Sequence, residues 1–208
     1  MVSMEDDIVA VGGSLDETTL LAAYRQGIFP WPAEGLPLLW YCPLERAILR
    51  FENLHIGRNL MRARKKTKLR FTIDQAFDQV IAQCAEIPRP EQDGTWITPE
   101  MVAAYCQLHK RGIAHSVEAW EGEELVGGLY GIDCGGSFSG ESMFHRAPDA
   151  SRLALLHLID HLQSRGCQWI DCQVMTPHFE RMGAEEIPRE GFLRELAAAL
   201  DAARLLFP

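Results

Sequence analysis

The sequence predicts an α+β fold, with a mixed sheet, flanking helices and a small N-terminal lobe rich in aromatic residues and proline. The main observation is the order of elements after Thr98, where a helix precedes three short strand-like segments, an apolar helix from Ser151 and a strand at 169–175. A strand, a helix and a second strand that follow a meander require a mixed sheet. A length of 208 residues with 47% hydrophobic content allows one substantial core.

Residues 1–47 are predicted to form the small lobe. A short helix begins near Asp16, a suitable N-cap, and ends before Gly27. Prolines and aromatic side chains without helical or strand periodicity then extend to Pro43, a composition that favours a fixed, irregular surface. The remainder, 48–208, is predicted to be the larger domain.

The larger domain is predicted from periodicity and from turn residues. It begins with a strand near Ala47 and a basic segment. Thr98 and Pro99 are typical of the first positions of a helix, which ends at Gly112. Strands separated by glycine-containing turns then form an antiparallel meander. The other predicted ranges are a strand at 69–73, a helix at 74–86, a polar loop at 88–94, meander strands at 115–120, 125–132 and 137–142, and helices at 151–165 and 192–206.

The composition also limits the location of the protein. No apolar stretch approaches the roughly 18 residues of a membrane span, and the acidic start lacks the basic and apolar regions of a signal peptide. We therefore expect a cytoplasmic protein with no membrane partner. The six cysteines form no Cys-x-x-Cys pair, and a chain of this length needs no disulfide to hold its core, so reduced thiols are expected.

Basic residues are concentrated in one segment of an otherwise acidic chain. Net charge is −9, yet seven of the twenty Lys and Arg residues lie within 58–70, and no acid interrupts them. In a helix, Arg58 and Arg62 share a face with Lys65 or Lys66, a stripe suited to a phosphate backbone. A solvated helix face is the alternative, although such faces normally interleave acids with bases. The predicted phosphate-binding residues are Arg58, Arg62, Arg64, Lys65, Lys66 and Lys68.

Two polar residues interrupt an apolar, strand-like run, Trp-Ile-Asp-Cys-Gln-Val-Met at 169–175. Because side chains alternate along a strand, Asp171 and Gln173 point to the same face. Burial of a carboxylate is costly unless the group is hydrogen-bonded. The pair therefore indicates either a satisfied polar network in the core or a site where charge is used.

Four short motifs in the sequence are similar to those of one known family. They are Ala-Tyr-Arg-Gln-Gly-Ile-Phe-Pro-Trp at 23–31, Gly-Thr-Trp-Ile-Thr at 94–98, Gly-Glu-Ser-Met-Phe at 140–144 and Ile-Asp-Cys-Gln-Val at 170–174. In this order and spacing they resemble the leucyl/phenylalanyl-tRNA–protein transferase family over nearly the whole chain. The resemblance implies an N-acetyltransferase-like fold for the larger domain, which agrees with the order of predicted elements as a fold analogy.

The resemblance implies an aminoacyltransferase that moves Leu or Phe, with Met left open, from aminoacyl-tRNA to the α-amino group of proteins that begin with Arg or Lys. This transfer would mark the acceptor for N-end-rule degradation, and it needs no cofactor and no metal. Asp171 and Gln173 match the family's catalytic pair, with Asp171 expected to hold Gln173. Either of the two is a candidate proton acceptor, and the loss of Asp171 is expected to cost more because a neutral Gln amide is a poor base. Glu141 is expected to orient the amine or to read the acceptor's cationic side chain, and a plain surface Glu is the alternative.

Aromatic and apolar positions complete the implied substrate site. Trp31 and Trp96 match residues that stack on the terminal adenosine of tRNA, with Tyr24 and Tyr105 as further candidates. Most pocket positions would be read as ordinary core without the resemblance. The implied pocket for the donor side chain consists of Leu129, Phe138, Met143, Leu155, Leu158, Leu162 and Ile170.

Other chemistries fit the sequence less well. His157 and His161 have the i, i+4 spacing of a zinc site, but no third ligand matches. The serines near His145 lack the Gly-x-Ser-x-Gly turn of many hydrolases. An acyl-CoA-dependent acetyltransferase of the same fold would need a glycine-rich pyrophosphate loop where this chain has 145–149. A non-catalytic RNA-binding module would need the basic helix but no inward-facing Asp and Gln.

Overall fold

The computed structural model describes residues 4–33, 35–87 and 96–207, so the predicted polar loop at 88–94 lies outside the described residues. The strands are β1 (Ile8–Val11), β2 (Phe29–Pro30), β3 (Leu39–Tyr41), β4 (Glu45–Arg50), β5 (Arg70–Ile73), β6 (Ala114–Glu121), β7 (Glu124–Asp133), β8 (Phe138–His145), β9 (Trp169–Gln173) and β10 (Glu185–Pro188). The helices are α1 (Glu17–Tyr24), α2 (Arg58–Lys66), α3 (Phe77–Glu86), α4 (Pro99–Lys110), α5 (Ala150–Ser164), α6 (Pro177–Arg181) and α7 (Arg189–Ala202).

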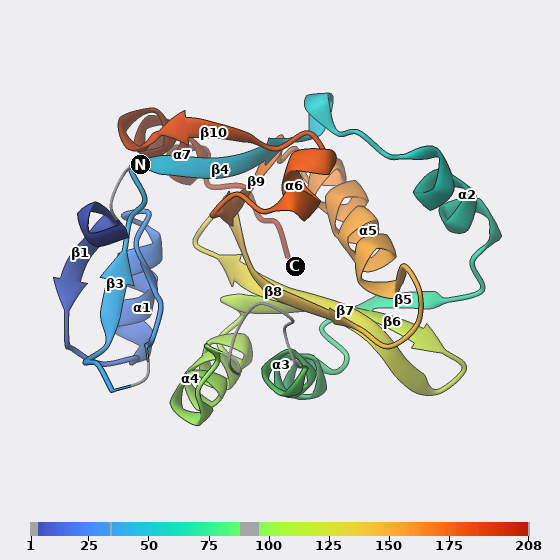
Figure 1. Cartoon of the computed structure of the whole chain (residues 1–208), viewed down its shortest axis with the longest axis horizontal. Helices are drawn as coiled ribbons and strands as arrows, with labels where there is room; N and C mark the ends of the chain where they lie inside the picture. The colour runs from blue at the N-terminus through green and yellow to red at the C-terminus, as the bar shows by residue number, and fades with distance from the viewer. Residues whose placement is uncertain (1–3, 34, 88–95, 208) are drawn as a thin grey trace.

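The strands form two sheets, and the larger one is mixed. Its order is β10-β4-β9-β8-β7-β6-β5, whereas β1, β3 and β2 form a small antiparallel sheet in the N-terminal lobe. Neighbours in the larger sheet are antiparallel except β8 and β9, which run parallel and are joined at one pair of partners, Ser139 and Asp171. Figure 1 shows the sheet dividing there into two arms that diverge. The predicted α+β class and its mixed sheet are confirmed.

Helices cover both faces of the lower arm of the sheet. In Figure 1, α3 and α4 lie below β7 and β6, and α5 lies above them. One cluster of buried apolar side chains, which includes Leu20, Phe29 and Met101, joins the N-terminal lobe to α3 and α4. A second cluster, which includes Leu155 and Leu206, lies against α5. The lobe therefore packs on the larger domain through a continuous apolar contact.

Two helix starts agree with local sequence signals, whereas the last helix, predicted at 192–206, spans Arg189–Ala202 and ends where Ala203 adopts a left-handed conformation. The Asp16 side chain accepts a hydrogen bond from the backbone of Thr19 and caps α1, and Thr98 does the same for α4 by accepting from the backbone of Met101. Both caps were predicted. By contrast, four short elements were not predicted: β1, β3, α6 and β10. Each is five residues or shorter, and the three strands among them form only by pairing with a distant part of the chain.

Two other expectations concern the thiols and the membrane. None of the six cysteines, all of which the structure describes, belongs to a disulfide, and all but Cys106 are buried. Over the described ranges, no helix is both long enough and apolar enough to cross a bilayer.

Candidate functional site

A cavity of about 820 Å³ opens where β8 and β9 diverge. Its walls combine apolar side chains from β7, β8, α5 and β9 with a group of polar side chains. Three of these polar residues are Glu141, from β8, and Asp171 and Gln173, from β9. The volume and mixed lining of the cavity are typical of sites that bind small molecules or parts of larger ones. The structure thus brings together the three residues predicted to be catalytic.

Asp171 is a buried carboxylate, and each of its two oxygens accepts two hydrogen bonds. Arg46 on β4 donates from Nε to Oδ1 at 2.7 Å and from Nη2 to Oδ2 at 2.6 Å. Ser139 donates from Oγ to Oδ2 at 2.8 Å, and the backbone N–H of Gln173 donates to Oδ1 at 2.9 Å. Asp171 therefore accepts four hydrogen bonds, two of them from the guanidinium of Arg46.

Arg46 is a functional residue that sequence reasoning missed. It is 1% exposed, and its guanidinium lies 4.7 Å from the ring centre of Phe29 and 4.5 Å from that of Phe192. Its Nη1 donates to the carbonyl of Gly27 at 3.0 Å, so it joins the segment after α1 to α7 and β9. The available signal was a cation directly before the apolar run of β4, since a buried cation requires an anionic partner.

Gln173 adopts an unusual backbone conformation that sequence did not predict. Its φ is 62°, in the left-handed region, and the pairing of β9 with β4 shifts register between Asp171 and Gln173. This conformation costs roughly 1–2 kcal/mol in a residue with a side chain. Bulges beside active sites commonly re-aim a side chain. Here the Gln173 amide turns toward Glu141, whereas Asp171 holds only its backbone.

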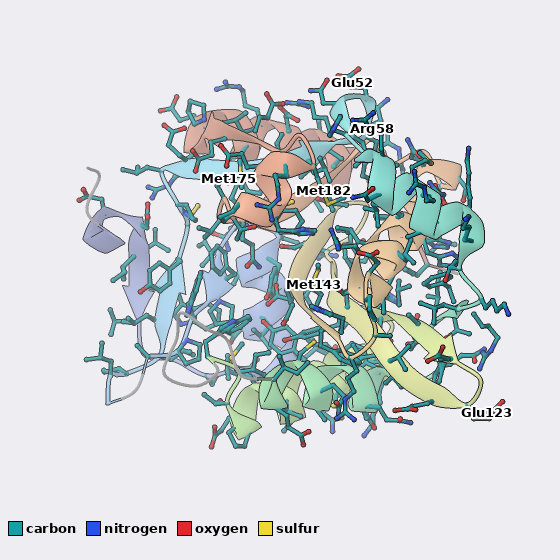
Figure 2. All side chains as sticks on the ribbon, turned by 45° about the vertical axis from the view of Figure 1, so that its right-hand side comes forward. Glu52, Arg58, Glu123, Met143, Met175 and Met182 are labelled. Carbon is teal, nitrogen blue, oxygen red and sulfur yellow. The ribbon has the colours of Figure 1, made fainter. Side chains whose placement is uncertain are left out.

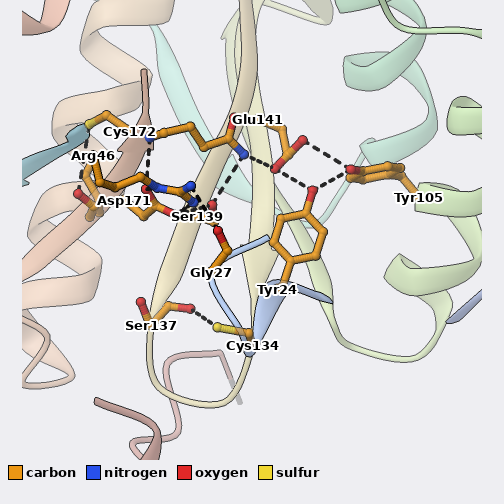
Figure 3. A network of polar contacts seen from close by, with 12 residues as sticks. Tyr24, Gly27, Arg46, Tyr105, Cys134, Ser137, Ser139, Glu141, Asp171 and Cys172 are labelled. Carbon is orange, nitrogen blue, oxygen red and sulfur yellow. Dashed lines mark hydrogen bonds and ion pairs between the residues drawn. The ribbon is translucent and has the colours of Figure 1, made fainter. Parts of the chain in front are cut away.

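Glu141 is surrounded by neutral hydrogen-bond donors rather than by a cation (Figure 3). Its Oε1 accepts from Tyr24 Oη at 2.7 Å and from Gln173 Nε2 at 2.7 Å, and its Oε2 accepts from Tyr105 Oη at 3.2 Å. Burial is the largest effect and raises the pKa of Glu141 from its ordinary value to about 7, although these three hydrogen bonds oppose the rise. A carboxylate with this pKa can take up and release a proton near neutral pH.

Six of the seven predicted pocket residues line the cavity. They are Leu129, Phe138, Met143, Leu155, Leu158 and Ile170. The seventh, Leu162, does not line it and is fully buried in the adjoining core. The reason is its place on α5, because the cavity meets the N-terminal half of this helix and Leu162 lies one turn beyond Leu158.

The predicted adenosine-binding aromatics divide into two pairs. Trp31 and Trp96 are partly exposed, line the cavity and lie with ring centres 5.8 Å apart. Tyr24 and Tyr105 are 3% and 0% exposed, and their hydroxyls are 2.5 Å apart where both contact Glu141. Neither tyrosine offers a ring face to a base in this structure. Their hydroxyls instead donate hydrogen bonds to the Glu141 carboxylate.

The basic segment forms α2 as predicted and lies away from the cavity. Figure 2 places Arg58 at the periphery and Met143, a cavity residue, near the middle. Arg64 forms an ion pair with Asp160 on α5, which attaches the helix to the larger domain. The other five predicted phosphate-binding residues form no ion pair with any described residue: Arg58, Arg62, Lys65, Lys66 and Lys68.

The histidines considered as metal ligands have other contacts. His161 Nε2 lies 2.8 Å from the carbonyl oxygen of Leu206, to which it donates, and the His157 ring stacks on Phe71. Among the described residues, no three His, Cys, Asp or Glu side chains are grouped as a metal site requires. Ser139 is bonded to Asp171 rather than to a histidine, so no hydrolase-like pair of Ser and His forms around it.

The site therefore combines an apolar pocket, a buried ion pair and a carboxylate that titrates near neutrality. Such a site can hold an apolar acyl group beside a proton acceptor. Residues 145–149, which lead into α5, contain no glycine that would let a pyrophosphate approach the backbone closely. The geometry thus favours transfer of an apolar acyl group over acyl-CoA chemistry.

Comparisons with known proteins agree with this chemistry. A model for leucyl/phenylalanyl-tRNA protein transferase matches residues 48–197, and one for the N-terminal domain of the same family matches residues 13–44. A crystal structure of a functionally unknown conserved protein from Staphylococcus epidermidis ATCC 12228 overlays with a TM-score of 0.43 and 10% identity, over 87% of this chain and 68% of that chain, which is too low to establish a shared fold.

Curated relatives are similar over almost the whole chain. A leucyl/phenylalanyl-tRNA–protein transferase of Anaeromyxobacter sp. (strain Fw109-5) is 50% identical over 96% of this chain and 85% of its own length. That of Myxococcus xanthus (strain DK1622) is 51% identical over 93% and 82%, and that of Nitratidesulfovibrio vulgaris (strain DP4) is 50% identical over 96% and 84%. Identity of this extent, together with the two family matches, shows that the chain belongs to the leucyl/phenylalanyl-tRNA–protein transferase family.

Proposed function

We propose that this protein transfers leucine or phenylalanine from aminoacyl-tRNA to the α-amino group of proteins that begin with Arg or Lys, in the cytoplasm, and thereby marks them for N-end-rule degradation. The observation that carries the proposal is the cavity at the divergence of β8 and β9, where an apolar pocket adjoins the Glu141 cluster. Family membership supports the reaction class, because curated relatives are named for it.

The donor amino acid occupies the apolar part of the cavity. Leu129, Leu155 and Ile170 are each at most 5% exposed and offer no polar group to a donor side chain. A pocket of this kind discriminates among apolar side chains by only about 1–3 kcal/mol per methylene. The same pocket therefore accepts Leu and Phe, and Met is close enough in size to enter it.

The terminal adenosine binds at the aromatic edge of the cavity. Trp31 comes from the N-terminal lobe and Trp96 from the larger domain, and both line the cavity. Stacking of a base on an aromatic ring contributes roughly 1–3 kcal/mol without reading sequence. In this proposal the 1–47 lobe and the 48–208 domain each supply one aromatic contact.

The acceptor amine attacks the ester carbonyl next to Glu141. A C–N bond forms, the bond from the carbonyl carbon to the ribose 3′ oxygen breaks, and one proton passes from the amine nitrogen to that oxygen. Glu141 takes the proton and returns it, since the pKa of about 7 allows both steps. The Gln173 amide holds Glu141, and the Arg46–Asp171 pair fixes the strand that carries Gln173.

A positively charged acceptor suits the immediate surroundings of Glu141, whereas the lining elsewhere also holds the cation Arg181. Asp171 is paired with Arg46 and Asp149 with Arg152, so both of these charges are offset. Glu141 has no cationic partner among the described residues. An incoming ammonium group or basic side chain would supply one.

The test is a transfer assay with defined substrates. Purified protein is incubated with leucyl-tRNA and a peptide that begins with Arg, and the products are weighed by mass spectrometry. We expect one leucine on the peptide N-terminus, and none when the peptide is N-acetylated or when acetyl-CoA replaces the charged tRNA. An acetylated peptide, or no product from any acyl donor, would contradict the proposal.

A further inference from the structure

The last described residues fold back into the core instead of ending at the surface. Leu206 is 0% exposed and Phe207 is 7% exposed. The Leu206 carbonyl accepts a hydrogen bond from His161 Nε2 on α5 at 2.8 Å. In Figure 1 the final segment after α7 runs into the space between the two arms of the sheet. This segment is therefore part of the interior that surrounds the cavity.

The ring of Phe207 is fixed by a rigid neighbour. It stacks on His115 of β6, with ring centres 3.8 Å apart and planes 8° apart. Both nitrogens of His115 have oxygen partners, Asp74 Oδ2 at 2.7 Å and the Gly112 carbonyl at 3.1 Å. Because these contacts hold the His115 ring in place, Phe207 cannot move in that direction.

Phe207 also packs on a residue of the donor pocket. Its ring centre lies 5.6 Å from that of Phe138, with the planes inclined by 44°. Phe138 is 1% exposed and lines the cavity, whereas Phe207 does not line it. The contacts thus run from His115 through Phe207 to Phe138 and then to the cavity.

We propose that Phe207 determines donor specificity by setting how far Phe138 can retreat, and so how deep the donor pocket is. The inference rests on the proposed function, since it concerns the pocket for the donor side chain. Protein interiors are close-packed, so a ring that is supported from behind cannot yield to a larger ligand. Phe207 is a positioning residue, because it acts on the substrate only through Phe138.

The experiment changes the volume behind Phe138 in both directions. Phe207→Leu removes ring volume, and Phe207→Trp adds it. These are used because Phe207→Ala would leave a large cavity in the core and would endanger folding. Leu205→Ala is the matched control, since Leu205 is a neighbour in the same segment but is 68% exposed. Thermal unfolding of each variant confirms that it is folded.

Two readouts are compared between phenylalanyl and leucyl donors. The first is the ratio of kcat/KM with phenylalanyl-tRNA to that with leucyl-tRNA. The second is the ratio of affinities for stable adenosine analogues that carry each amino acid in amide linkage at the 3′ position, measured by calorimetry. In Phe207→Leu we expect both ratios to rise about tenfold in favour of the phenylalanyl donor, because Phe138 can then move back. Tenfold is the lower end of the discrimination that one methylene gives in an apolar pocket.

The opposite substitution provides the decisive comparison. Phe207→Trp should lower both ratios, and Leu205→Ala should leave them unchanged. Equal loss of both donors in the two Phe207 variants, or no binding of either analogue by the unmodified protein, would overturn the inference. If the unmodified protein transfers neither amino acid but the affinity ratios shift as expected, the proposed transfer reaction fails and the role of Phe207 in the pocket stands.

Discussion

Asp171 and Glu141 are two carboxylates on neighbouring strands, yet their surroundings give them opposite properties. Asp171 faces the guanidinium of Arg46 and two further donors, the Ser139 hydroxyl and the backbone N–H of Gln173. Glu141 faces two tyrosine hydroxyls and an amide, and burial raises its pKa to about 7. The two carboxylates thus differ in the partners that they meet, a full positive charge for Asp171 and neutral donors for Glu141.

The comparison also changes which residue we regard as central to the chemistry. From sequence, Asp171 and Gln173 were the candidate proton acceptors. Glu141, also predicted to be catalytic, was expected to orient the amine or to read the acceptor's cationic side chain. In the structure, Asp171 holds the backbone of Gln173, and the Gln173 side chain holds Glu141. In the proposed reaction, Glu141 therefore accepts the proton from the attacking amine. The Arg46–Asp171 pair holds the strand that carries Gln173.

Glu141→Gln gives the strongest test of this assignment. The substitution keeps the shape and most hydrogen bonds but cannot accept a proton, so we expect kcat to fall by roughly 10²–10⁴-fold, the usual contribution of a general base. Single-turnover transfer with leucyl-tRNA measures the effect. Binding of the charged tRNA should remain within about twofold of normal, because the change is isosteric. A kcat within a factor of about three of normal would show that Glu141 is not the general base, and that Asp171 or the substrate itself accepts the proton.

Arg46→Met tests the structural half of the comparison. It removes the cation and leaves the buried Asp171 without a positively charged partner, which should lower the free energy of unfolding by roughly 3–5 kcal/mol. Denaturant unfolding measures the change. Adding Asp171→Asn to the variant removes the unpaired charge, so we expect it to restore part of the lost stability. If the double variant is less stable than Arg46→Met, the pair does not act as inferred.

The pH dependence of rate and stability should identify Glu141 by opposite slopes. Deprotonated Glu141 is the base, so its titration should add a factor of about ten per pH unit to kcat below pH 7 and none above it. The folded pKa lies above the ordinary 4.5, so the group's contribution to stability is complete below pH 4.5 and is lost as pH rises through 7. The loss is at most about 3 kcal/mol, and solvent in the cavity reduces it.

Glu141→Gln should remove both slopes and serves as the control for this measurement. Rate profiles with excess acceptor and thermal unfolding between about pH 4.5 and pH 8 measure them. The slope that comes from the acceptor's own amine, with a pKa of about 7.7–8.0, should persist in the variant. Identical pH profiles for the variant and the unmodified protein would show that Glu141 is not the group that titrates.

The smallest effect is expected at α2, far from both carboxylates. Replacing Arg62 and Lys65 with Ala should weaken binding of any tRNA and reduce its salt dependence by roughly 0.7–0.9 in log–log slope for each phosphate that is no longer neutralised. Binding measured from low to moderate salt provides the slope. A matched Arg64→Ala variant should change it less, because Arg64 is already paired with Asp160. An unchanged slope in the double variant would exclude α2 from the tRNA-binding surface.

Much of the fold followed from local sequence signals. N-caps such as Asp16 and Thr98, glycine stops and the alternation of the meander are properties of a few adjacent residues, so they were readable in one chain. The alternation at 169–175 likewise placed Asp171 and Gln173 together, and the structure puts both on the cavity wall. The short elements β1, β3 and β10 were not readable, because their partners are distant in sequence.

The amino-acid sequence by itself determined most of the longer elements and the shared face of Asp171 and Gln173, whereas the pocket positions came from the family resemblance. Only the tertiary structure decided which acid meets a cation. Arg46 and Asp171 are 125 residues apart, and Tyr24 and Glu141 are 117 apart. Such pairs depend on strand register and on which side chains are buried together. The pKa of a carboxylate follows from its neighbours in space, and for that reason its role could not be read from the chain alone.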